Sequence, residues 1–427
     1  FANRENLAIV PWGRGTKMAL GHLPERLDIV VCTSRMDRMM DVDASNLTVT
    51  IEAGVKFRDM QARLATQEDR CYLPLEDLAA SADEIICSDR SHSGCFLPMD
   101  PSHAHFATMG GIIAANSNGP RRLLYGLPRD AILGVRMVSP TGEILGSGGK
   151  TVKNVSGYDV SKLAVGSMGS LGIICEMTLK ILPLPEKMET LLISFRSFQE
   201  ASAFVEGIFE TTLLPAAVEV MNQQACTHLY MDGISDPGPD GYVSALALEG
   251  FDPAVKRMQN EITQMARAHG ARSHACLQEE KHLSFWLQVS NLDAVLAHRA
   301  PGLVKARLHY PISEWKGIVE SVENTLSHAR LHYTLQVHAG NGISLPRLLM
   351  GPNDAEAMDR AAEAMNRLLA RCREVEGNLV IEGAPTEMKE RLKIWGETGS
   401  DIVLMKRLKD QIDPAGVMCP GRFVGGM

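Results

Sequence analysis

Short runs in which apolar and polar residues alternate, separated by turn-forming residues, dominate the first part of the chain. Such runs at residues 7–10, 28–31 and 47–51 predict β-strands, and the three- and four-residue apolar spacing at 56–67 predicts a helix. The same texture returns between residues 96 and 182, where the runs AILGVRMVSP and IICEMTLKILP predict two more strands. This mixture of short strands and helices indicates an α+β domain.

After residue 186 the chain has fewer glycines and longer elements. Helical spacing at residues 198–209, 252–269 and 354–375 alternates with strand-like runs, which are LLISF, AAVEVM, YVSALALEG, ARLHYP, LHYTLQVHAG and NLVIEG. This pattern predicts a second α+β domain that has an antiparallel sheet with helices on one face. The Leu-Pro-Leu-Pro run that ends at Pro185 marks the boundary, and a last helix is expected to end near Asp413.

Composition and charge narrow the class of protein. The 427 residues are 45% apolar and 22% charged, as in globular proteins, and a formal net charge of -8 without a basic cluster argues against nucleic-acid binding. No apolar run approaches the roughly 20 residues of a membrane-spanning helix, and the N-terminus has no signal-peptide pattern. Because the chain starts at Phe1 and FANRENLAIVPWG resembles the end of a helix before a strand, we expect that a segment precedes it.

Nine cysteines are scattered along the chain without the density of a disulfide framework, which favours a reducing cytoplasm. Cys71, Cys87, His92 and Cys95 come closest to a cluster, but their spacing matches no common zinc or iron-sulfur pattern. A polar loop with incidental thiols is the favoured interpretation of this segment.

Three glycine-rich segments suggest a bound cofactor. Residues 151–174, TVKNVSGYDVSKLAVGSMGSLGII, are too rich in glycine for a helix and too apolar for a linker, which indicates backbone that wraps around something flat. The turn PWGRGTK at residues 11–17 follows a predicted strand, and its backbone N–H groups, Arg14 and Lys17 suit a phosphate. It is not the GxGxxG fingerprint, because residue 18 is Met, and a plain turn is the alternative.

The third segment, residues 96–126, mixes short polar groups with an apolar run. Thr108, Gly110, Gly111 and Asn116 surround the run IIAA, a mixture that suits a ligand with a diphosphate and an apolar ring system. A buried glycine-rich crossover without a ligand is the alternative.

Several stretches of the chain, taken in order, resemble the FAD-binding domain of the vanillyl-alcohol oxidase and p-cresol methylhydroxylase (PCMH) flavoprotein superfamily. They are PWGRGTK, DPSHAHFATMGGIIAANSNGPRRLLYG, GVRMVSPTGEIL, VKNVSGYDVSKLAVGSMGSLGII and DPAGVMCPGRF. The resemblance is closest to its glycolate oxidase and D-lactate dehydrogenase branch. It implies a PCMH-type two-lobed FAD-binding domain at residues 1–185, an α+β cap domain at 186–400, and a C-terminal segment, 401–427, that returns to the FAD domain.

The resemblance also implies which residues hold FAD, and non-covalent attachment because the turn after Pro11 contains no histidine. The implied residues are Pro11, Trp12, Gly13, Arg14, Gly15, Thr16 and Lys17 at the pyrophosphate, Thr108, Met109, Gly110, Gly111, Asn116 and Gly119 at the flavin and ribityl chain, and Gly169, Gly172, Ile173 and Ile174 near the adenosine.

The second domain departs from the pattern of the catalytic relatives, which hold a divalent metal with an HxGDGNxH motif and a later Glu-His pair. This chain reads HAGNGISL from His338 and has glycine after Glu382, so one imidazole and one carboxylate remain, and we expect no metal. In this respect the chain is similar to the FAD-binding E subunits of bacterial glycolate oxidases. That similarity implies a complex with a catalytic flavoprotein subunit and an iron-sulfur subunit, which would account for any association with a membrane.

Oxidation of a hydroxyacid needs a base for the hydroxyl proton and a cation for the carboxylate, besides the flavin. The candidates for the base are His338 and then Glu382, although a hydrogen-bonded structural histidine is the commoner case on an apolar strand. Arg307 could pair with a carboxylate, but a solvated or core-edge arginine is favoured. Three functions follow: an FAD subunit of a hydroxyacid dehydrogenase complex, a self-sufficient flavin dehydrogenase, and a non-catalytic scaffold.

Overall fold

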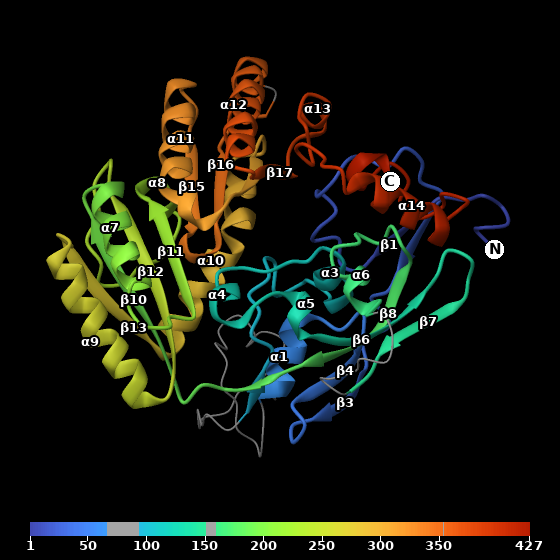
Figure 1. Ribbon diagram of the computed structural model, residues 1–427, viewed down its shortest axis with the longest axis horizontal. Coiled ribbons are helices and arrows are strands. Elements are labelled where there is room, and N and C mark those ends of the chain that lie inside the picture. The colour runs from blue at the N-terminus through green and yellow to red at the C-terminus, as the bar shows by residue number, and fades with distance from the viewer. Residues whose placement is uncertain (66–93, 151–158, 353) are drawn as a thin grey trace. The chain divides into compact units, whose positions relative to one another are not determined.

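The computed structural model describes residues 1–65, 94–150, 159–352 and 354–427 (Figure 1). Two compact units are formed. Unit 1 comprises Phe1–Gly119, Gly126–Leu184 and Thr398–Met427, and unit 2 comprises Pro120–Tyr125 and Pro185–Glu397. The short segment Pro120–Tyr125 therefore belongs with unit 2, although its neighbours on both sides in the sequence belong to unit 1.

Unit 1 is built on a five-stranded antiparallel sheet in the order β3-β4-β8-β6-β7. Every residue of β4 is buried, and α1 packs against this core through Met60 and Leu64, four residues apart on one helical face. The strands of unit 1 are β1 (Ile9–Trp12), β2 (Ile29–Cys32), β3 (Met39–Asp43), β4 (Thr48–Glu52), β5 (Cys95–Phe96), β6 (Ile132–Val138), β7 (Ile144–Gly148), β8 (Ile173–Lys180) and β9 (Leu182–Pro183). Its helices are α1 (Phe57–Ala65), α3 (Met109–Ala114), α5 (Pro128–Ala131), α6 (Ser161–Ala164) and α14 (Ile402–Ile412).

Unit 2 contains an eight-stranded antiparallel sheet in the order β13-β10-β12-β11-β15-β16-β14-β17. The predicted α+β class with an antiparallel sheet is therefore confirmed. The strands are β10 (Lys187–Phe195), β11 (Ala217–Asn222), β12 (Tyr242–Gly250), β13 (Ser273–Gln278), β14 (Val304–His309), β15 (Tyr333–His338), β16 (Ile343–Leu348) and β17 (Asn378–Gly383). The helices are α4 (Arg122–Tyr125), α7 (Phe198–Phe209), α8 (Gln223–Cys226), α9 (Asp252–Ala268), α10 (Glu279–Arg299), α11 (Trp315–His328), α12 (Ala355–Glu374) and α13 (Thr386–Lys389).

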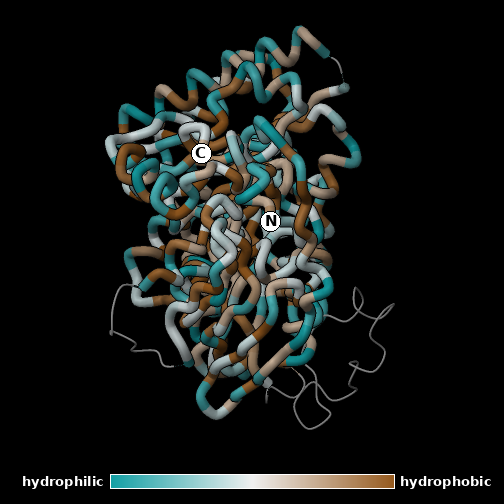
Figure 2. Tube along the Cα trace, turned by 90° about the vertical axis from the view of Figure 1, so that its right-hand side faces the viewer, coloured by the Kyte–Doolittle hydropathy of each residue, from teal (hydrophilic) through white to brown (hydrophobic). Residues whose placement is uncertain are grey.

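Both faces of the sheet in unit 2 carry apolar clusters, so the prediction of helices on one face was wrong. Alternate residues of β10 enter different clusters: Leu191 and Ile193 join the one that includes α7, α9, α11 and α12, whereas Leu192 joins the one that includes α10. Because side chains on a strand alternate between faces, the two clusters lie on opposite sides of the sheet. Figure 2 shows polar residues along much of the outer helical trace, as expected for amphipathic helices.

Helix α10 is the longest element that the sequence pattern missed. Its buried positions recur every three or four residues, which is the helical period, but two of them are the polar residues His282 and Asp293. These two side chains interrupt the apolar stripe that would otherwise have revealed the helix. Both belong to the polar networks described below.

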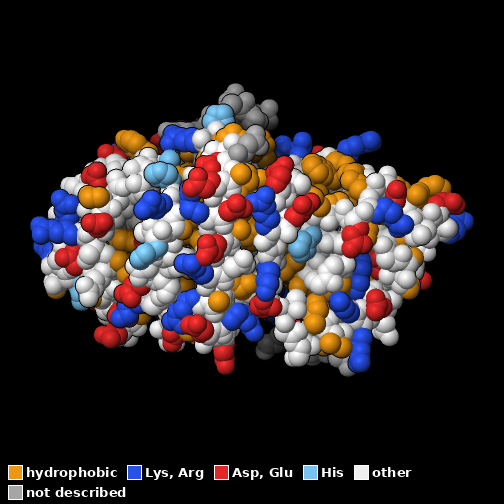
Figure 3. All heavy atoms as spheres, turned by 90° about the horizontal axis from the view of Figure 1, so that it is seen from above, with side chains coloured by type: hydrophobic (Ala, Val, Ile, Leu, Met, Phe, Trp, Pro, Cys, Tyr) orange, Lys and Arg blue, Asp and Glu red, His pale blue; other side chains and the backbone are white. Residues whose placement is uncertain are grey.

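On the face that Figure 3 shows, Lys and Arg side chains are interspersed with Asp and Glu. Within the described ranges, none of the helices has both the length and the apolar character that a membrane span requires.

The C-terminal segment is fastened to unit 1 by a buried lysine. Lys409 Nζ donates to the carbonyl oxygens of Ser170, at 2.8 Å, and Met418, at 2.9 Å, and pairs with Asp413 Oδ2 at 2.5 Å. Met418 in turn pairs with Ile9 at the start of β1. The segment thereby touches both β1 and the loop that contains Ser170.

Replacing Lys409 by Met is expected to lower the free energy of unfolding by about 3–5 kcal/mol, because the fully buried carboxylate of Asp413 would lose its charge partner. Lys406, on the same helix but exposed, is the matched control, and its replacement by Met should change the value by less than about 0.5 kcal/mol. Urea unfolding of the two variants measures the difference. Equal stabilities would show that the ion pair does not fasten the segment.

Candidate functional site

The first two glycine-rich segments meet at Gly13 in unit 1. A Cβ atom on Gly13 would lie 2.1 Å from Thr108 Oγ1, a distance that only glycine avoids. Thr108 is itself fixed: it pairs with Lys56 in an isolated bridge, and its side chain caps α3 by accepting from Gly111 N at 3.4 Å. The turn after β1 is thus held directly against the start of α3.

The third segment joins the other two through its own glycines. A Cβ atom on Gly169 would lie 2.9 Å from Pro11 Cγ, and the backbone there has a φ of +76°, which favours glycine. Gly166 N donates to Ile113 O at 3.0 Å, and Met168 N donates to Ala114 O at 2.8 Å. Three segments that are far apart in sequence therefore converge in one place.

Three residues with left-handed backbone lie at this convergence. Asn116, Met168 and Cys419 are not glycine, yet they have φ values of 47°, 52° and 52°. They lie close together, since Cys419 Sγ is 3.5 Å from Met168 O and Asn116 Cβ would be 3.6 Å from a Cβ on Gly166. Such strain is typical of ligand-binding sites, where the surrounding structure enforces it.

One buried polar atom at this place has no partner among the described residues. Asn116 Oδ1 is buried and makes no hydrogen bond with any residue that the structure describes. A buried oxygen of this kind normally has a hydrogen-bond donor, because leaving it unpaired costs about 1–3 kcal/mol. Close backbone approaches and an unsatisfied acceptor fit a ligand that carries both a flat ring system and hydrogen-bond donors.

The other predicted cofactor residues occupy varied positions around this convergence. Trp12 is 37% exposed and its ring packs on Gly15, Arg14 is exposed, and Lys17 Nζ donates to Ser102 Oγ. Thr16, in the same turn, is half-buried.

Two predicted contacts have their side chains in the core of unit 1. Met109 is fully buried and Ile174 is 6% exposed, so only their backbone could face a ligand. Three of the predicted glycines pack on other parts of unit 1: Gly110 on Ala53, Gly119 on the backbone of Asp100, and Gly172 on the carbonyl of Val138. Ile173 is half-buried at the start of β8. Residues 151–158 of the third segment, together with Cys71, Cys87 and His92, lie outside the described residues.

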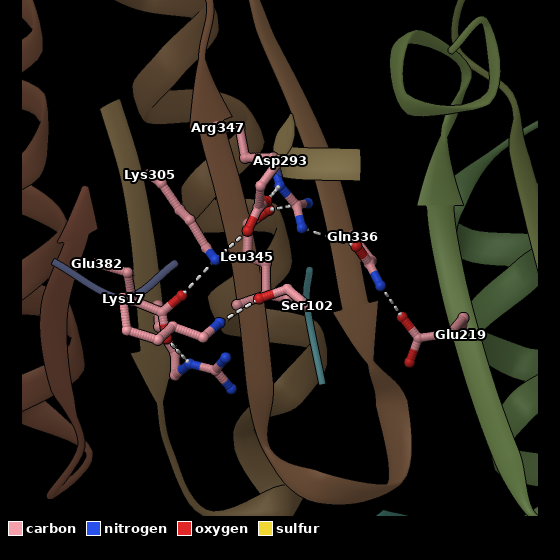
Figure 4. A network of polar contacts seen from close by, with 10 residues as sticks. Lys17, Ser102, Glu219, Asp293, Lys305, Gln336, Leu345, Arg347 and Glu382 are labelled. Atoms are coloured by element: carbon pink, nitrogen blue, oxygen red, sulfur yellow. Dashed lines mark hydrogen bonds and ion pairs between the residues drawn. The ribbon is translucent and has the colours of Figure 1, made fainter. Parts of the chain in front are cut away.

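A polar network crosses one face of the sheet in unit 2 and contains both predicted catalytic residues, His338 and Glu382. Figure 4 shows the part of this network from Glu219 to Glu382. His338 Nδ1 lies 2.6 Å from Glu219 Oε1, and Gln336 Nε2 donates to Glu219 Oε2 at 2.6 Å. Gln336 Oε1 then accepts from Arg347 Nη2 at 3.0 Å. These contacts join β11, β15 and β16.

From Arg347 the network continues to Glu382. Arg347 Nε donates to Asp293 Oδ1 at 2.5 Å, and Asp293 also accepts from Lys305 Nζ. Lys305 Nζ lies 2.8 Å from Glu382 Oε2, and Arg307 Nε donates to Glu382 Oε1. His338 and Glu382 are thus connected through a continuous series of contacts rather than by direct contact.

Charge and burial set the states of the three carboxyl groups. Burial raises the pKa of Glu219 well above its usual value. Burial alone would act in the same direction on Glu382, but Arg307 and Lys305 hold its pKa well below the usual value. Arg347 and Lys305 likewise outweigh burial and hold the pKa of Asp293 low. Glu382 is therefore a charged partner of two cations, which makes it a weak base.

Sequence reasoning identified His338, Glu382 and Arg307 but missed the remaining members of this network. Glu219 and Arg347 are single charged residues within otherwise apolar strands, AVEVMN and ISLPRL. A buried charge needs a partner, so an isolated charge in a predicted buried strand was the available signal. The missing information was which strands would be neighbours.

A second network links the segment before α4 to the sheet and to α10. Arg121 Nε pairs with Glu249 Oε1 at 2.7 Å, and Tyr125 OH donates to Glu249 Oε2 at 2.7 Å. Burial lowers the pKa of His282 well below its usual value, and Arg121 adds to the effect, so the ring is neutral. His282 Nε2 then accepts from Arg121 Nη2 at 3.3 Å, which leaves Nδ1–H to donate to Thr190 Oγ1 at 2.8 Å.

Over the described ranges, no three His, Cys, Asp or Glu side chains gather in the way that a metal-binding cluster requires. Cys95, the described member of the cysteine-rich stretch, is buried, and burial raises the pKa of its thiol.

The pH dependence of stability is expected to depend on His309. Burial lowers its pKa to about 4, and Arg307, Arg122 and His338 add positive charge that opposes the effect of Glu382. The unfolded chain therefore binds more protons than the folded protein between about pH 6.5 and 4. As the pH is lowered through this range, the free energy of unfolding should decrease by at most about 3 kcal/mol because of this group. Replacing His309 by Gln should flatten the pH dependence of the free energy of unfolding, measured with urea. Replacing His298, which is exposed on α10, by Gln should leave that dependence unchanged. Parallel curves for wild type and His309→Gln would contradict the assignment.

Comparisons with known proteins agree with this geometry. The family model for FAD linked oxidases, C-terminal domain, matches residues 184–423, and the model for the FAD binding domain matches residues 1–77 and 90–148. The chain is 28% identical over 428 residues to glycolate oxidase subunit GlcD of Bacillus subtilis, which covers 99% of this chain and 85% of the relative. It is 31% identical to a D-lactate dehydrogenase of Anaerostipes hadrus, over 52% of this chain and 42% of the relative.

A solved structure of p-cresol methylhydroxylase has a TM-score of 0.70 at 15% identity, and covers 99% of this chain and 85% of that chain. It confirms the predicted PCMH-type fold. The predicted branch and the predicted cofactor are confirmed by the relatives and the family models, so FAD is the cofactor and the protein is an FAD-dependent oxidoreductase. The glycolate oxidase relative reported above is a D subunit, whereas the sequence motifs predicted an E subunit. From this fold, this site and these matches, the chain belongs to the family of FAD linked oxidases.

Proposed function

We propose that this protein is the FAD-binding subunit of a multi-subunit 2-hydroxyacid dehydrogenase, which oxidises an acid such as glycolate or D-lactate and passes electrons to an iron-sulfur partner. The names of the relatives support the substrate class, since they are a glycolate oxidase subunit and a D-lactate dehydrogenase. A catalytic flavoprotein subunit is the second proposed partner. The proposal includes a cytoplasmic location, with any membrane association supplied by the partners.

The state of Glu382 is the observation that carries the proposal of an E-type role. Its two carboxylate oxygens are each occupied by a cation, Oε2 by Lys305 and Oε1 by Arg307. A divalent metal would have to displace both cations and would then be repelled by them. The cap domain therefore holds fixed positive side chains where its catalytic relatives are expected to hold a metal ion, and a partner with a complete metal motif would supply that chemistry.

The proposed FAD site consists of the three converging segments in unit 1. We place the pyrophosphate at residues 11–17, where backbone N–H groups and the nearby charges of Arg14 and Lys17 would bind it. Thr108–Gly111, Asn116 and Gly119 would line the flavin and ribityl chain, and Gly169–Ile174 the adenosine. Bound flavin accepts a hydride, while the role of these residues is to orient it and exclude water.

A self-sufficient dehydrogenase is the second candidate, and the contact between His338 and Glu219 favours it. A buried imidazole 2.6 Å from a carboxyl group is held in one orientation, as a general base requires. In this case His338 would take the hydroxyl proton of the substrate without help from a partner subunit.

Replacing Gly13 by Ala is expected to weaken FAD binding by about 1–3 kcal/mol, because the new methyl group would lie on Thr108 Oγ1 and push two FAD-binding segments apart. Gly146→Ala is the matched control, since a Cβ atom there has open space. Fluorescence titration of the FAD-free protein with FAD measures both affinities. Unchanged affinity in a folded Gly13→Ala variant would contradict the placement of the site.

Anaerobic mixing of the FAD-loaded chain with glycolate or D-lactate separates the candidate functions. The proposed complex subunit should keep its oxidised flavin absorbance when alone and lose it when the partner subunits are added. Rapid bleaching of the lone chain would instead establish the self-sufficient enzyme. A flavin that stays oxidised even with partners and both acids would leave only the scaffold.

A further inference from the structure

The polar network of unit 2 holds three cationic side chains close together. Its cations are Lys305, Arg307 and Arg347, and its ionised carboxylates are Asp293 and Glu382, whose pKa values are held low by these same cations. Glu382 is shared between Lys305 and Arg307, and Asp293 between Lys305 and Arg347, and all of these side chains are less than one-fifth exposed. Three cations that share two carboxylates in a largely buried region favour the approach of a further anion.

Arg307 is the member that can meet an added anion. Its Nε atom donates to Glu382, and within the part of the chain that the structure describes no hydrogen bond reaches Nη1 or Nη2. Its side chain is 16% exposed, so it is neither a freely solvated residue nor a closed core residue. A guanidinium held through Nε keeps its two terminal nitrogens in a fixed plane, which is the geometry that binds a carboxylate.

The strand register places two imidazoles on the same face of the sheet as Arg307. Ile343 of β16 is paired with His309 of β14 on one side and with His338 of β15 on the other. Directly paired residues point to the same face, and Arg307 lies two residues before His309 on the same strand. Ile343 and Leu345 between them are buried and apolar, which lowers the local dielectric and strengthens any ion pair formed there.

We propose that the Arg307 guanidinium, positioned by Glu382, binds the carboxylate of a small organic acid on this face, between β14 and β15. The inference rests on the proposed function for the identity of the acid, because a 2-hydroxyacid carries such a carboxylate. His338, anchored by Glu219, is on the same face, so one end of the acid would meet a cation and the other an imidazole. The site assigns a binding role to the arginine that sequence reasoning took for a structural residue.

Calorimetric titration of the FAD-loaded chain with methoxyacetate tests the site, since this probe keeps the carboxylate of glycolate but has no hydroxyl group to oxidise. We expect Arg307→Gln to raise its dissociation constant roughly tenfold to a hundredfold. Arg307→Lys, which keeps the charge but not the planar fork, should raise it less. Glu382→Gln leaves Arg307 present but unheld and should also weaken binding.

Two controls isolate the charge pair. Arg367→Gln removes an arginine that is paired with Glu363 on the exposed side of α12, and it should leave the affinity for methoxyacetate unchanged. Methoxyacetamide, in which a neutral amide replaces the carboxylate, should bind wild type and Arg307→Gln equally weakly. Melting temperatures confirm that each variant is folded, and Arg307→Lys takes the place of Arg307→Gln if the latter does not fold.

Equal affinity of the wild type and the Arg307 variants for methoxyacetate, or no binding to the wild type, would overturn the inference. The outcome is distinct from that of the proposed function. Arg307-dependent binding without hydroxyacid oxidation, even when the partner subunits are present, would support the carboxylate site and contradict the function. Hydroxyacid oxidation with Arg307-independent binding would contradict the site alone.

Discussion

The structure of unit 1 depends on the close approach of backbone at Gly13 and Gly169. Only glycine allows the turn after β1 to touch Thr108 and the loop before β8 to touch Pro11. These two approaches bring together three segments that lie far apart in sequence, and the C-terminal segment is fastened over the third by Lys409. The left-handed backbone of Asn116, Met168 and Cys419 at the same place shows that packing elsewhere in unit 1 maintains a strained arrangement.

Unit 2 follows a different principle, in which charge rather than backbone approach organises the candidate site. Lys305, Arg307 and Arg347 alternate with Asp293 and Glu382 across neighbouring strands and α10. Buried ion pairs of this kind contribute little net stability, because desolvation offsets their attraction, but they fix side-chain positions closely. Fixed cations suit the recognition of a carboxylate, which is the chemistry that the proposed substrate requires.

Much of the fold could be predicted from the sequence, because the apolar periodicity of elements such as α7, α9 and α12 matches their buried faces. The three glycine-rich segments that the sequence suggested for one ligand do converge in unit 1, while their contact with FAD stays a prediction. Helix α10 was missed because His282 and Asp293 lie on its buried face, and each is satisfied by residues on other elements. The roles of Glu219 and Arg307 depend on strand order, and periodicity within one strand carries no information about its neighbours.

The central claim is that the three segments of unit 1 close around one FAD molecule. Hydrogen exchange of the backbone amides, compared between FAD-free and FAD-loaded protein, tests it most directly. Residues 11–17, 108–119 and 169–174 should gain protection together, with little change over the sheet of unit 2. Protection confined to one of these segments, or located elsewhere, would contradict it.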